Sequence, residues 1–186
     1  MDDMREVQIG SELIYEGKIL DFYRDTVRLP NGRSATRELV RHNGAVAIVP
    51  LLDDGRVIVE DQYRYPHDGV IVEIPAGKLD GPDEDPEEAA RRELQEETGY
   101  TCEKLIPMGP FYPTAAYSSE TIWLYLAKGL KAGEQKLDEG EFLTVRAMPL
   151  EELVRDVLDG KVPDGKTQAA IMRVWAMEMA VHTVIT

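Results

Sequence analysis

The pattern of hydrophobic and polar positions changes character about halfway along the chain. The first half consists of short apolar, aromatic and β-branched runs separated by Gly, Asn, Asp and Pro, which is typical of strands joined by turns. We predict strands at residues 11–15, 19–29, 35–42, 45–52, 56–63 and 70–74. Residues 45–52 are almost continuously apolar, which indicates a strand buried on both of its faces.

A helical pattern interrupts these strands. Asp85 is a suitable N-cap, Pro86 suits the first helical position, and Glu88 follows three residues after the cap. Gly99 is a suitable end for this helix. Two further strands are expected at 121–127 and 142–148, and two closing helices at 150–158 and 167–181. This order predicts an α+β fold, an α/β/α sandwich built on a mixed β-sheet.

Composition and charge narrow the class of protein. The chain has 186 residues, of which 43% are hydrophobic, and this is enough for one domain with a buried core. Asp and Glu outnumber Lys and Arg by 35 to 21, for a net charge of −14. Because affinity for nucleic acids comes mainly from Lys and Arg, this charge predicts no nucleic-acid partner. An anionic ligand would need a metal ion to supply positive charge.

The expected cellular compartment follows from the cysteine content and from the apolar runs of the sequence. Cys102 is the single cysteine, so there is no internal disulfide, and the chain suits a reducing compartment. The acidic N-terminal residues are not followed by an apolar stretch, so we expect no signal peptide. Since no apolar run approaches the length of about 18 residues that spans a bilayer, we expect a cytoplasmic protein without a membrane partner.

The densest acidic stretch, residues 80–97, contains a candidate metal site. Glu93 and Glu97 are four residues apart and share one helical face, with Glu96 beside them. Like charges at this spacing destabilise a helix unless something compensates them. Carboxylate oxygens at the junction of a loop and a helix are ligands that suit Mg²⁺ or Mn²⁺.

The same stretch resembles the signature of the Nudix hydrolase family. That signature is a Gly, five residues, a Glu, seven residues, and then Arg-Glu-aliphatic-x-Glu-Glu-x-Gly-aliphatic. Here seven residues separate Glu84 from Arg92-Glu93-Leu94-Gln95-Glu96-Glu97-Thr98-Gly99-Tyr100. Two positions depart from the pattern. Six residues instead of five separate Gly77 from Glu84, and Tyr100 replaces the final aliphatic residue.

The resemblance implies specific roles within this box. Glu93 and Glu97 would be the principal ligands of Mg²⁺, with Mn²⁺ as the alternative ion. Glu96 would be a further ligand or a neighbour of the ligands, and the backbone carbonyl of Ala76 would contribute. Arg92 would pair with a nearby carboxylate and orient the loop. The implied reaction is attack of water on a phosphorus of a diphosphate joined to a nucleoside, assisted by the metal.

Residues outside the box resemble one branch of the family, the ADP-ribose pyrophosphatases and nucleoside-diphosphate-sugar hydrolases. The matching stretches are residues 44–50, 61–66 and 73–78. This resemblance implies that Arg64 contacts the substrate phosphates, with Arg37 as a weaker candidate, and that Glu73 and Gly77 belong to the substrate site. The alternative for each arginine is a surface salt bridge.

Two further stretches bear on the substrate and on the catalytic base. Ala115 stands where ADP-ribose enzymes of this branch usually carry a proline in a turn after the box, so other nucleoside-diphosphate sugars remain open as substrates. The loop at 137–142 resembles an acidic loop that closes over the diphosphate. Glu139 best matches the general base and Glu141 an additional metal ligand, but the sequence does not decide between these two roles.

The resemblance also divides the chain. Residues 1–43 would be an N-terminal β-strand extension through which two copies form a homodimer, and residues 44–186 would be the Nudix domain. One alternative function is hydrolysis of another nucleoside-diphosphate derivative, such as a dinucleoside polyphosphate or a dinucleotide cofactor. A second is a non-enzymatic nucleotide-sensing module. The intact carboxylates of the box and the short acidic chain after Pro149 argue against a sensor with an attached DNA-binding domain.

Overall fold

The computed structural model describes residues 4–18, 20–81 and 83–184, and side chains up to residue 180. The chain divides into two compact units. The N-terminal unit comprises Met1–Gly44 and Tyr112–Thr121, and the larger unit comprises Ala45–Phe111 and Ile122–Thr186. The association of residues 112–121 with the N-terminal strands depends on contacts distant in sequence, and our sequence analysis did not predict it.

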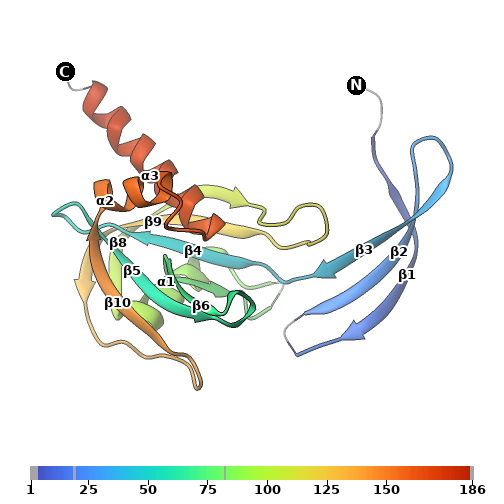
Figure 1. The fold of residues 1–186 in the computed structure, drawn as a ribbon, viewed down its shortest axis with the longest axis horizontal. Helices are drawn as coiled ribbons and strands as arrows, with labels where there is room; N and C mark the ends of the chain where they lie inside the picture. The colour runs from blue at the N-terminus through green and yellow to red at the C-terminus, as the bar shows by residue number, and fades with distance from the viewer. Residues whose placement is uncertain (1–3, 19, 82, 185–186) are drawn as a thin grey trace. The chain divides into compact units, whose positions relative to one another are not determined.

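The N-terminal unit contains a three-stranded antiparallel sheet, whose strands are labelled in Figure 1. The strands are β1 (Val7–Glu16), β2 (Asp21–Arg28) and β3 (Ser34–Arg41). Residues 112–121 join this sheet through Val40, whose backbone N–H donates to the carbonyl of Tyr117 at 2.8 Å and whose carbonyl accepts from Ser119 at 3.0 Å. Every residue of β1 is exposed within the single chain, including its apolar side chains.

The larger unit contains two sheets. A four-stranded mixed sheet has the order β7-β4-β9-β8, in which β4 and β9 are parallel and the other neighbours antiparallel. A three-stranded antiparallel sheet has the order β10-β5-β6. The seven strands are β4 (Ala45–Pro50), β5 (Arg56–Arg64), β6 (Gly69–Glu73), β7 (Ala76–Lys78), β8 (Tyr100–Phe111), β9 (Ile122–Ala132) and β10 (Leu143–Pro149).

Helices cover both faces of the mixed sheet (Figure 1). They are α1 (Pro86–Thr98), α2 (Leu150–Leu158) and α3 (Gly165–Val184). Strand β4 is buried along its whole length, as predicted. Its Val46 and Ile48 pack with Leu94 of α1, whereas Ala47 and Val49 pack on the opposite face in the core shared with α2 and α3. The predicted α+β fold with helices on both sides of a mixed sheet is therefore confirmed.

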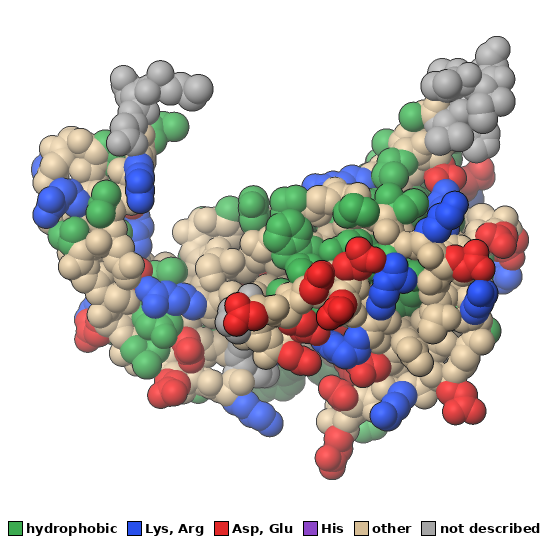
Figure 2. All heavy atoms as spheres, turned by 180° about the vertical axis from the view of Figure 1, so that it is seen from behind, with side chains coloured by type: hydrophobic (Ala, Val, Ile, Leu, Met, Phe, Trp, Pro, Cys, Tyr) green, Lys and Arg blue, Asp and Glu red, His purple; other side chains and the backbone are tan. Residues whose placement is uncertain are grey.

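Basic and acidic side chains are mixed on the face of the protein drawn in Figure 2. On the face in Figure 2, acidic and basic side chains of the described residues are interspersed among apolar ones. None of the helices in the described part of the chain is long and apolar enough to cross a lipid bilayer.

Candidate active site

Helix α1 carries the box carboxylates and begins and ends as its sequence predicts. The Asp85 side chain accepts a hydrogen bond from the backbone N–H of Glu87 at 2.8 Å, and Pro86 occupies the first helical turn. Gly99 ends the helix in the left-handed conformation, with φ of 74°. Ala90 and Leu94 are fully buried, so they anchor the opposite side of the helix in the core.

The strand β7 lies directly against the acidic face of α1. The backbone N–H of Ala76 donates to Glu97 Oε2 at 2.8 Å. A Cβ atom on Gly77 would lie 1.9 Å from Glu93 Cδ, so only glycine leaves room for this carboxylate. The structure therefore brings together four of the predicted site residues, with Glu93 above Gly77 and Glu97 bound to Ala76.

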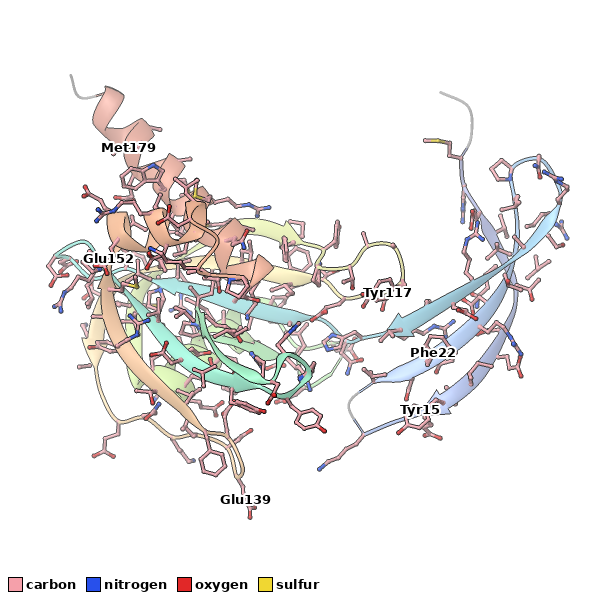
Figure 3. The ribbon with its side chains drawn as sticks, viewed as in Figure 1. Tyr15, Phe22, Tyr117, Glu139, Glu152 and Met179 are labelled. Carbon is pink, nitrogen blue, oxygen red and sulfur yellow. The ribbon has the colours of Figure 1, made fainter. Side chains whose placement is uncertain are left out.

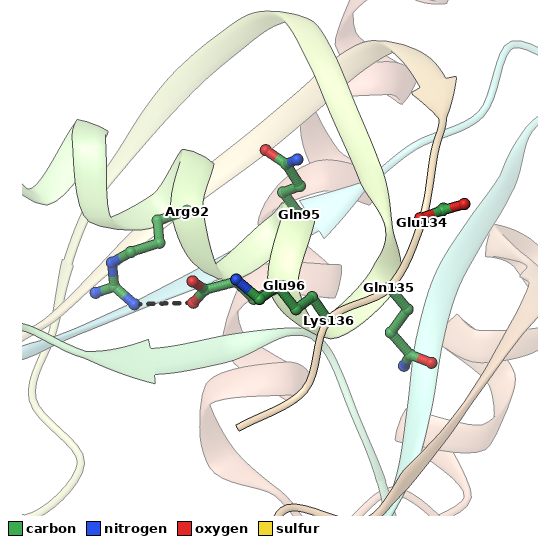
Figure 4. A pocket seen from close by; sticks show the side chains of 6 residues that line it. All are labelled: Arg92, Gln95, Glu96, Glu134, Gln135 and Lys136. Atoms are coloured by element: carbon green, nitrogen blue, oxygen red, sulfur yellow. Dashed lines mark hydrogen bonds and ion pairs between the residues drawn. The ribbon is translucent and has the colours of Figure 1, made fainter. Parts of the chain in front are cut away.

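Arg92 pairs with carboxylates of the box, as the resemblance implied. One guanidinium nitrogen lies 2.7 Å from Glu93 Oε1 and 3.2 Å from Glu96 Oε2, and the latter pair is drawn in Figure 4. The other nitrogen lies 3.2 Å from Glu84 Oε1 and 3.3 Å from the carbonyl of Lys78. Arg92 thus connects α1 to the loop that precedes it.

The root of the acidic loop packs on the C-terminal end of α1. The backbone N–H of Lys136 donates to the carbonyl of Glu96 at 2.9 Å, and Gln135 Nε2 donates to the carbonyl of Glu97 at 2.5 Å. A polar pocket of about 490 Å³ lies between this segment and the helix (Figure 4). Its lining residues are Arg92, Gln95, Glu96, Glu134, Gln135 and Lys136.

The structure separates the two candidate bases of the acidic loop. Glu139 is exposed, and in Figure 3 its side chain points away from the protein at the tip of the loop. Glu141 is only partly exposed, and its negative charge contributes to raising the pKa of both Glu93 and Glu97. In this conformation Glu141 belongs to the acidic cluster, and Glu139 would reach it only after a movement of the loop.

Burial raises the pKa of several carboxylates in this cluster above the ordinary value. Burial, together with the charge of Glu60, raises the pKa of Glu97 to about 9. Burial likewise raises the pKa of Glu60, which is 1% exposed, to about 8. The Oε2 atom of Glu60 is buried and has no hydrogen-bond partner among the residues that the structure describes. Sequence analysis missed Glu60, although a glutamate inside the apolar run of β5 is an anomaly that could have revealed it.

A divalent cation fits this cluster by its chemistry. The residues supply hard oxygen ligands that a cation would bind. They also include a buried carboxylate oxygen that lacks a partner within the described chain, and an excess of negative charge that a cation would compensate. Among the described residues, however, no group of three or more His, Cys, Asp or Glu side chains is already arranged to hold a metal ion. Glu93 and Glu96 instead contact the guanidinium of Arg92.

Arg64 and Glu73 form a second part of the candidate site, and they lie in the same compact unit of the chain as the box. Arg64 donates through Nε and Nη2 to the two carboxylate oxygens of Glu73, at 2.6 and 2.8 Å. Burial alone would raise the pKa of Glu73, but hydrogen bonds from Arg64 and the charge of Lys166 outweigh burial and lower it. Lys166 also contacts Glu73, and sequence analysis missed it. A lysine in the first turn of a helix opposes the helix dipole, and this signal could have identified it.

Arg37 lies in the N-terminal unit, on β3. Its guanidinium forms an ion pair with Glu6 and donates to the carbonyl of Thr36 at 2.9 Å. The ion pair is the surface salt bridge that we considered as the alternative to substrate binding.

Comparison with known proteins identifies the family. Residues 41–170 match the NUDIX domain family, and residues 6–40 match the nucleoside diphosphate sugar hydrolase N-terminal domain. The chain is 43% identical to an ADP-ribose pyrophosphatase of Bacillus subtilis, over 92% of this chain and 93% of the relative. It is 39% identical to a methanol dehydrogenase activator of Bacillus methanolicus, over 95% of this chain and 96% of the relative.

A solved structure agrees with this assignment at the level of the fold. The crystal structure of an ADP compounds hydrolase has a TM-score of 0.83 and 23% sequence identity, and the match covers 95% of both chains. The chain belongs to the Nudix family, and it is a Nudix hydrolase. Its first strands carry the N-terminal domain of the nucleoside diphosphate sugar hydrolases.

The raised pKa values of Glu60 and Glu97 predict how stability changes with pH when metal is removed. Glu60 and Glu97 have pKa values of about 8 and about 9 in the folded chain, against an ordinary value of 4.5. Between roughly pH 5 and pH 9 the folded state therefore holds protons that the unfolded state releases, so stability must fall as the pH rises. We expect the melting temperature in EDTA to decrease between pH 5.5 and pH 8.5.

The variant Glu60→Gln provides the matched control for this pH effect. It removes the buried charge while keeping the shape, so it should raise the melting temperature at pH 8.5 by roughly 3 to 6 °C and leave it nearly unchanged at pH 5.5. Differential scanning fluorimetry of both proteins across this range is sufficient. A melting temperature that rises with pH in the wild type would refute the explanation.

Proposed function

We propose that this Nudix hydrolase cleaves the diphosphate of ADP-ribose or a related nucleoside-diphosphate sugar, with Mg²⁺ as its cofactor and Mn²⁺ as a substitute. The products would be a nucleoside monophosphate and a sugar phosphate. One observation carries the proposal. Buried Glu97 accepts a hydrogen bond from the backbone of Ala76, and Glu93 packs against Gly77. They form an acidic cluster with Glu60, whose Oε2 atom has no hydrogen-bond partner in the described part of the chain. The name of the relative from Bacillus subtilis supports the choice of substrate.

Each residue of the cluster has a defined task in this proposal. Glu93, Glu97 and the carbonyl of Ala76 would hold the divalent ion, and Glu96 and Glu141 would complete or support its ligands. When bound, the ion would neutralise the diphosphate and lower the pKa of the attacking water. These roles explain how a chain with a net charge of −14 can bind an anionic substrate.

The remaining residues would orient the substrate and accept its proton. Arg64, fixed by its two hydrogen bonds to Glu73, would bind the diphosphate, and Arg37 would be a secondary contact. A carboxylate of the acidic loop, Glu139 or Glu141, would accept the proton of the attacking water. Arg92 would keep the loop before α1 in place.

A substrate panel tests the proposed function. Purified protein with Mg²⁺ is incubated with ADP-ribose, other nucleoside-diphosphate sugars, dinucleoside polyphosphates and dinucleotide cofactors, and phosphate is followed after treatment of the products with phosphatase. Because Ala115 replaces a proline typical of ADP-ribose enzymes, we expect more than one nucleoside-diphosphate sugar to be cleaved. Preference for ADP-ribose by a thousandfold or more would contradict this interpretation of Ala115. Cleavage of the dinucleotides or polyphosphates alone would establish the alternative function.

The N-terminal unit suggests a partner. Five large apolar side chains of β1 are exposed in the single chain, namely Val7, Ile9, Leu13, Ile14 and Tyr15. Exposed apolar side chains concentrated on one strand typically mark a protein interface, and a second copy related by two-fold symmetry is the simplest partner. We propose a homodimer. Sedimentation at micromolar concentration should give about twice the monomer mass of 20.9 kDa, and Ile9→Asp should shift it towards the monomer. A wild-type mass near 20.9 kDa throughout would exclude the dimer.

The surroundings that we propose for the protein follow from its charge and its cysteine. Its negative charge would repel nucleic acids, so we propose no nucleic-acid or membrane partner. Cys102 is a free cysteine, which suits the reducing cytoplasm.

A further inference from the structure

The first turn of α3 carries a buried lysine that reaches the substrate half of the proposed site. Lys166 is 10% exposed in its side chain and forms an ion pair with Glu73 Oε2. Its Nζ also lies 3.1 Å from Asp164 Oδ2. Burying an ammonium group is unfavourable unless it is paired, so the contacts of Lys166 decide whether this arrangement is stable.

Further hydrogen bonds connect the segment around Lys166 to Ile74, the residue that follows strand β6. Asp164 Oδ2 accepts from the backbone N–H of Thr167 at 2.9 Å and from its hydroxyl at 2.6 Å. The Thr167 hydroxyl oxygen in turn accepts from the backbone N–H of Ile74 at 3.0 Å. These contacts hold the start of α3 beside Glu73 and Ile74, the residues that shortly precede β7 in the sequence.

Glu73 stands between two cations of different exposure. Lys166, whose side chain is 10% exposed, pairs with Oε2, and Arg64, whose side chain is 38% exposed, contacts both carboxylate oxygens. The contacts use Nε and Nη2 of Arg64, and within the described part of the chain Nη1 has no hydrogen-bond partner. The guanidinium therefore has one edge fixed by Glu73 and another edge free for an anion.

The charge of Lys166 also permits two carboxylates to face each other. Glu60 and Glu73 are directly opposite in the antiparallel pair of β5 and β6, so their side chains share one face, and each is 1% exposed. The positive charge of Lys166 favours the ionised form of both carboxylates. Without it, Glu73 would face Glu60 with Arg64 as its remaining cationic partner.

We propose that Lys166 is a positioning residue for binding of the substrate diphosphate, acting through Glu73 on the guanidinium of Arg64. The inference rests on the proposed function, because Arg64 is the phosphate contact only if the substrate is a nucleoside diphosphate derivative. Loss of Lys166 removes the ion pair that holds Glu73 Oε2 from the side of α3, so the carboxylate and the arginine that it holds can shift. Among the described residues, Lys166 contacts Glu73 and Asp164 and not the proposed metal ligands Glu93 and Glu97, so we expect the main effect on KM and a small effect on kcat.

The test is a double-mutant cycle with a matched control. In Lys166→Met we expect KM for the best substrate of the panel to rise about 10- to 50-fold, with kcat within about threefold of the wild type. In the background of Arg64→Ala the same change should alter KM by less than about twofold, because the residue through which it acts is already missing. Lys161→Met removes an exposed lysine from the preceding loop and should leave both constants unchanged.

Conservative variants keep the test decisive if Lys166→Met does not fold. Lys166→Gln removes the charge but keeps a polar group and should raise KM as the methionine does, whereas Lys166→Arg should keep KM within about fivefold of the wild type. Equal increases in KM with and without Arg64, or a loss confined to kcat, would overturn the inference. An inactive wild type and an inactive Lys161→Met would instead count against the proposed function, so the two failures are distinguishable.

Discussion

Replacing Glu97 by glutamine should lower kcat by at least about 100-fold while leaving the protein at least as stable as the wild type. Glutamine has the same shape, and its carbonyl oxygen can still accept the hydrogen bond that Ala76 donates to Glu97 at 2.8 Å. The variant lacks the negative charge that would bind the cation. Glu93 can replace this charge only in part, because Arg92 already pairs with it. Since burial raises the pKa of Glu97 to about 9, the neutral glutamine suits this environment without metal.

Turnover with Mg²⁺ and thermal denaturation in EDTA separate these two effects. The matched control is Glu88→Gln, which removes an exposed carboxylate from the same helix and should retain wild-type turnover. Unchanged activity in Glu97→Gln would remove Glu97 from the metal site. A large loss of stability would mean that the charge of Glu97 has a structural role that burial does not suggest.

The second large loss of kcat is expected from a substitution in the acidic loop. We predict that Glu139→Gln lowers kcat by about 10²- to 10⁴-fold with little change in KM, the range expected for loss of a general base. Glu141→Gln should instead weaken the dependence on Mg²⁺. Gly140, in the left-handed conformation with φ of 90°, separates the two residues, and Glu139 points into solvent at the tip. Glu139 can act as the base only if the loop closes on the bound substrate.

The two variants and Asp138→Asn are compared over a range of Mg²⁺ concentrations. Asp138 shares the exposed turn and is expected to be dispensable, so it controls for the loss of charge from the loop. If Glu141→Gln shows the larger loss of kcat, the roles are exchanged, as its electrostatic influence on Glu97 would favour. If neither change matters, the base lies outside this loop.

Local signals in the sequence predicted much of this structure. The cap at Asp85 and the stop at Gly99 set the bounds of α1 to within a residue, and the apolar run 45–52 predicted the buried β4. The twelve-residue strand β8 was missed, because Pro107 and Gly109 interrupt its pattern and its pairing with β9 provides the hydrogen bonds that hold it extended. The short β7 was missed because three residues are too few to show any period.

In the candidate site, too, the features set by local sequence were predicted and those set by distant contacts were not. The spacing of Glu93 and Glu97 on one face follows from helical geometry alone, and the structure has both on the side of α1 that meets β7. Lys166 was not predicted, because the carboxylate that stabilises its buried charge lies far away in sequence. Glu60 was missed although its place in an apolar run is a local signal. Lys166 and Glu73 are 93 residues apart.

Asp164 makes the C-terminal helix part of the proposed substrate-binding site. Its carboxylate binds the backbone N–H and the hydroxyl of Thr167 and the ammonium of Lys166, so one side chain both starts α3 and steadies the group beside Glu73. Proteolytic removal of the chain from this point onwards would therefore do more than expose the apolar core beneath α3. It would leave Glu60 and Glu73 buried side by side without their lysine, so truncation would impair substrate binding even in a fragment that stayed folded.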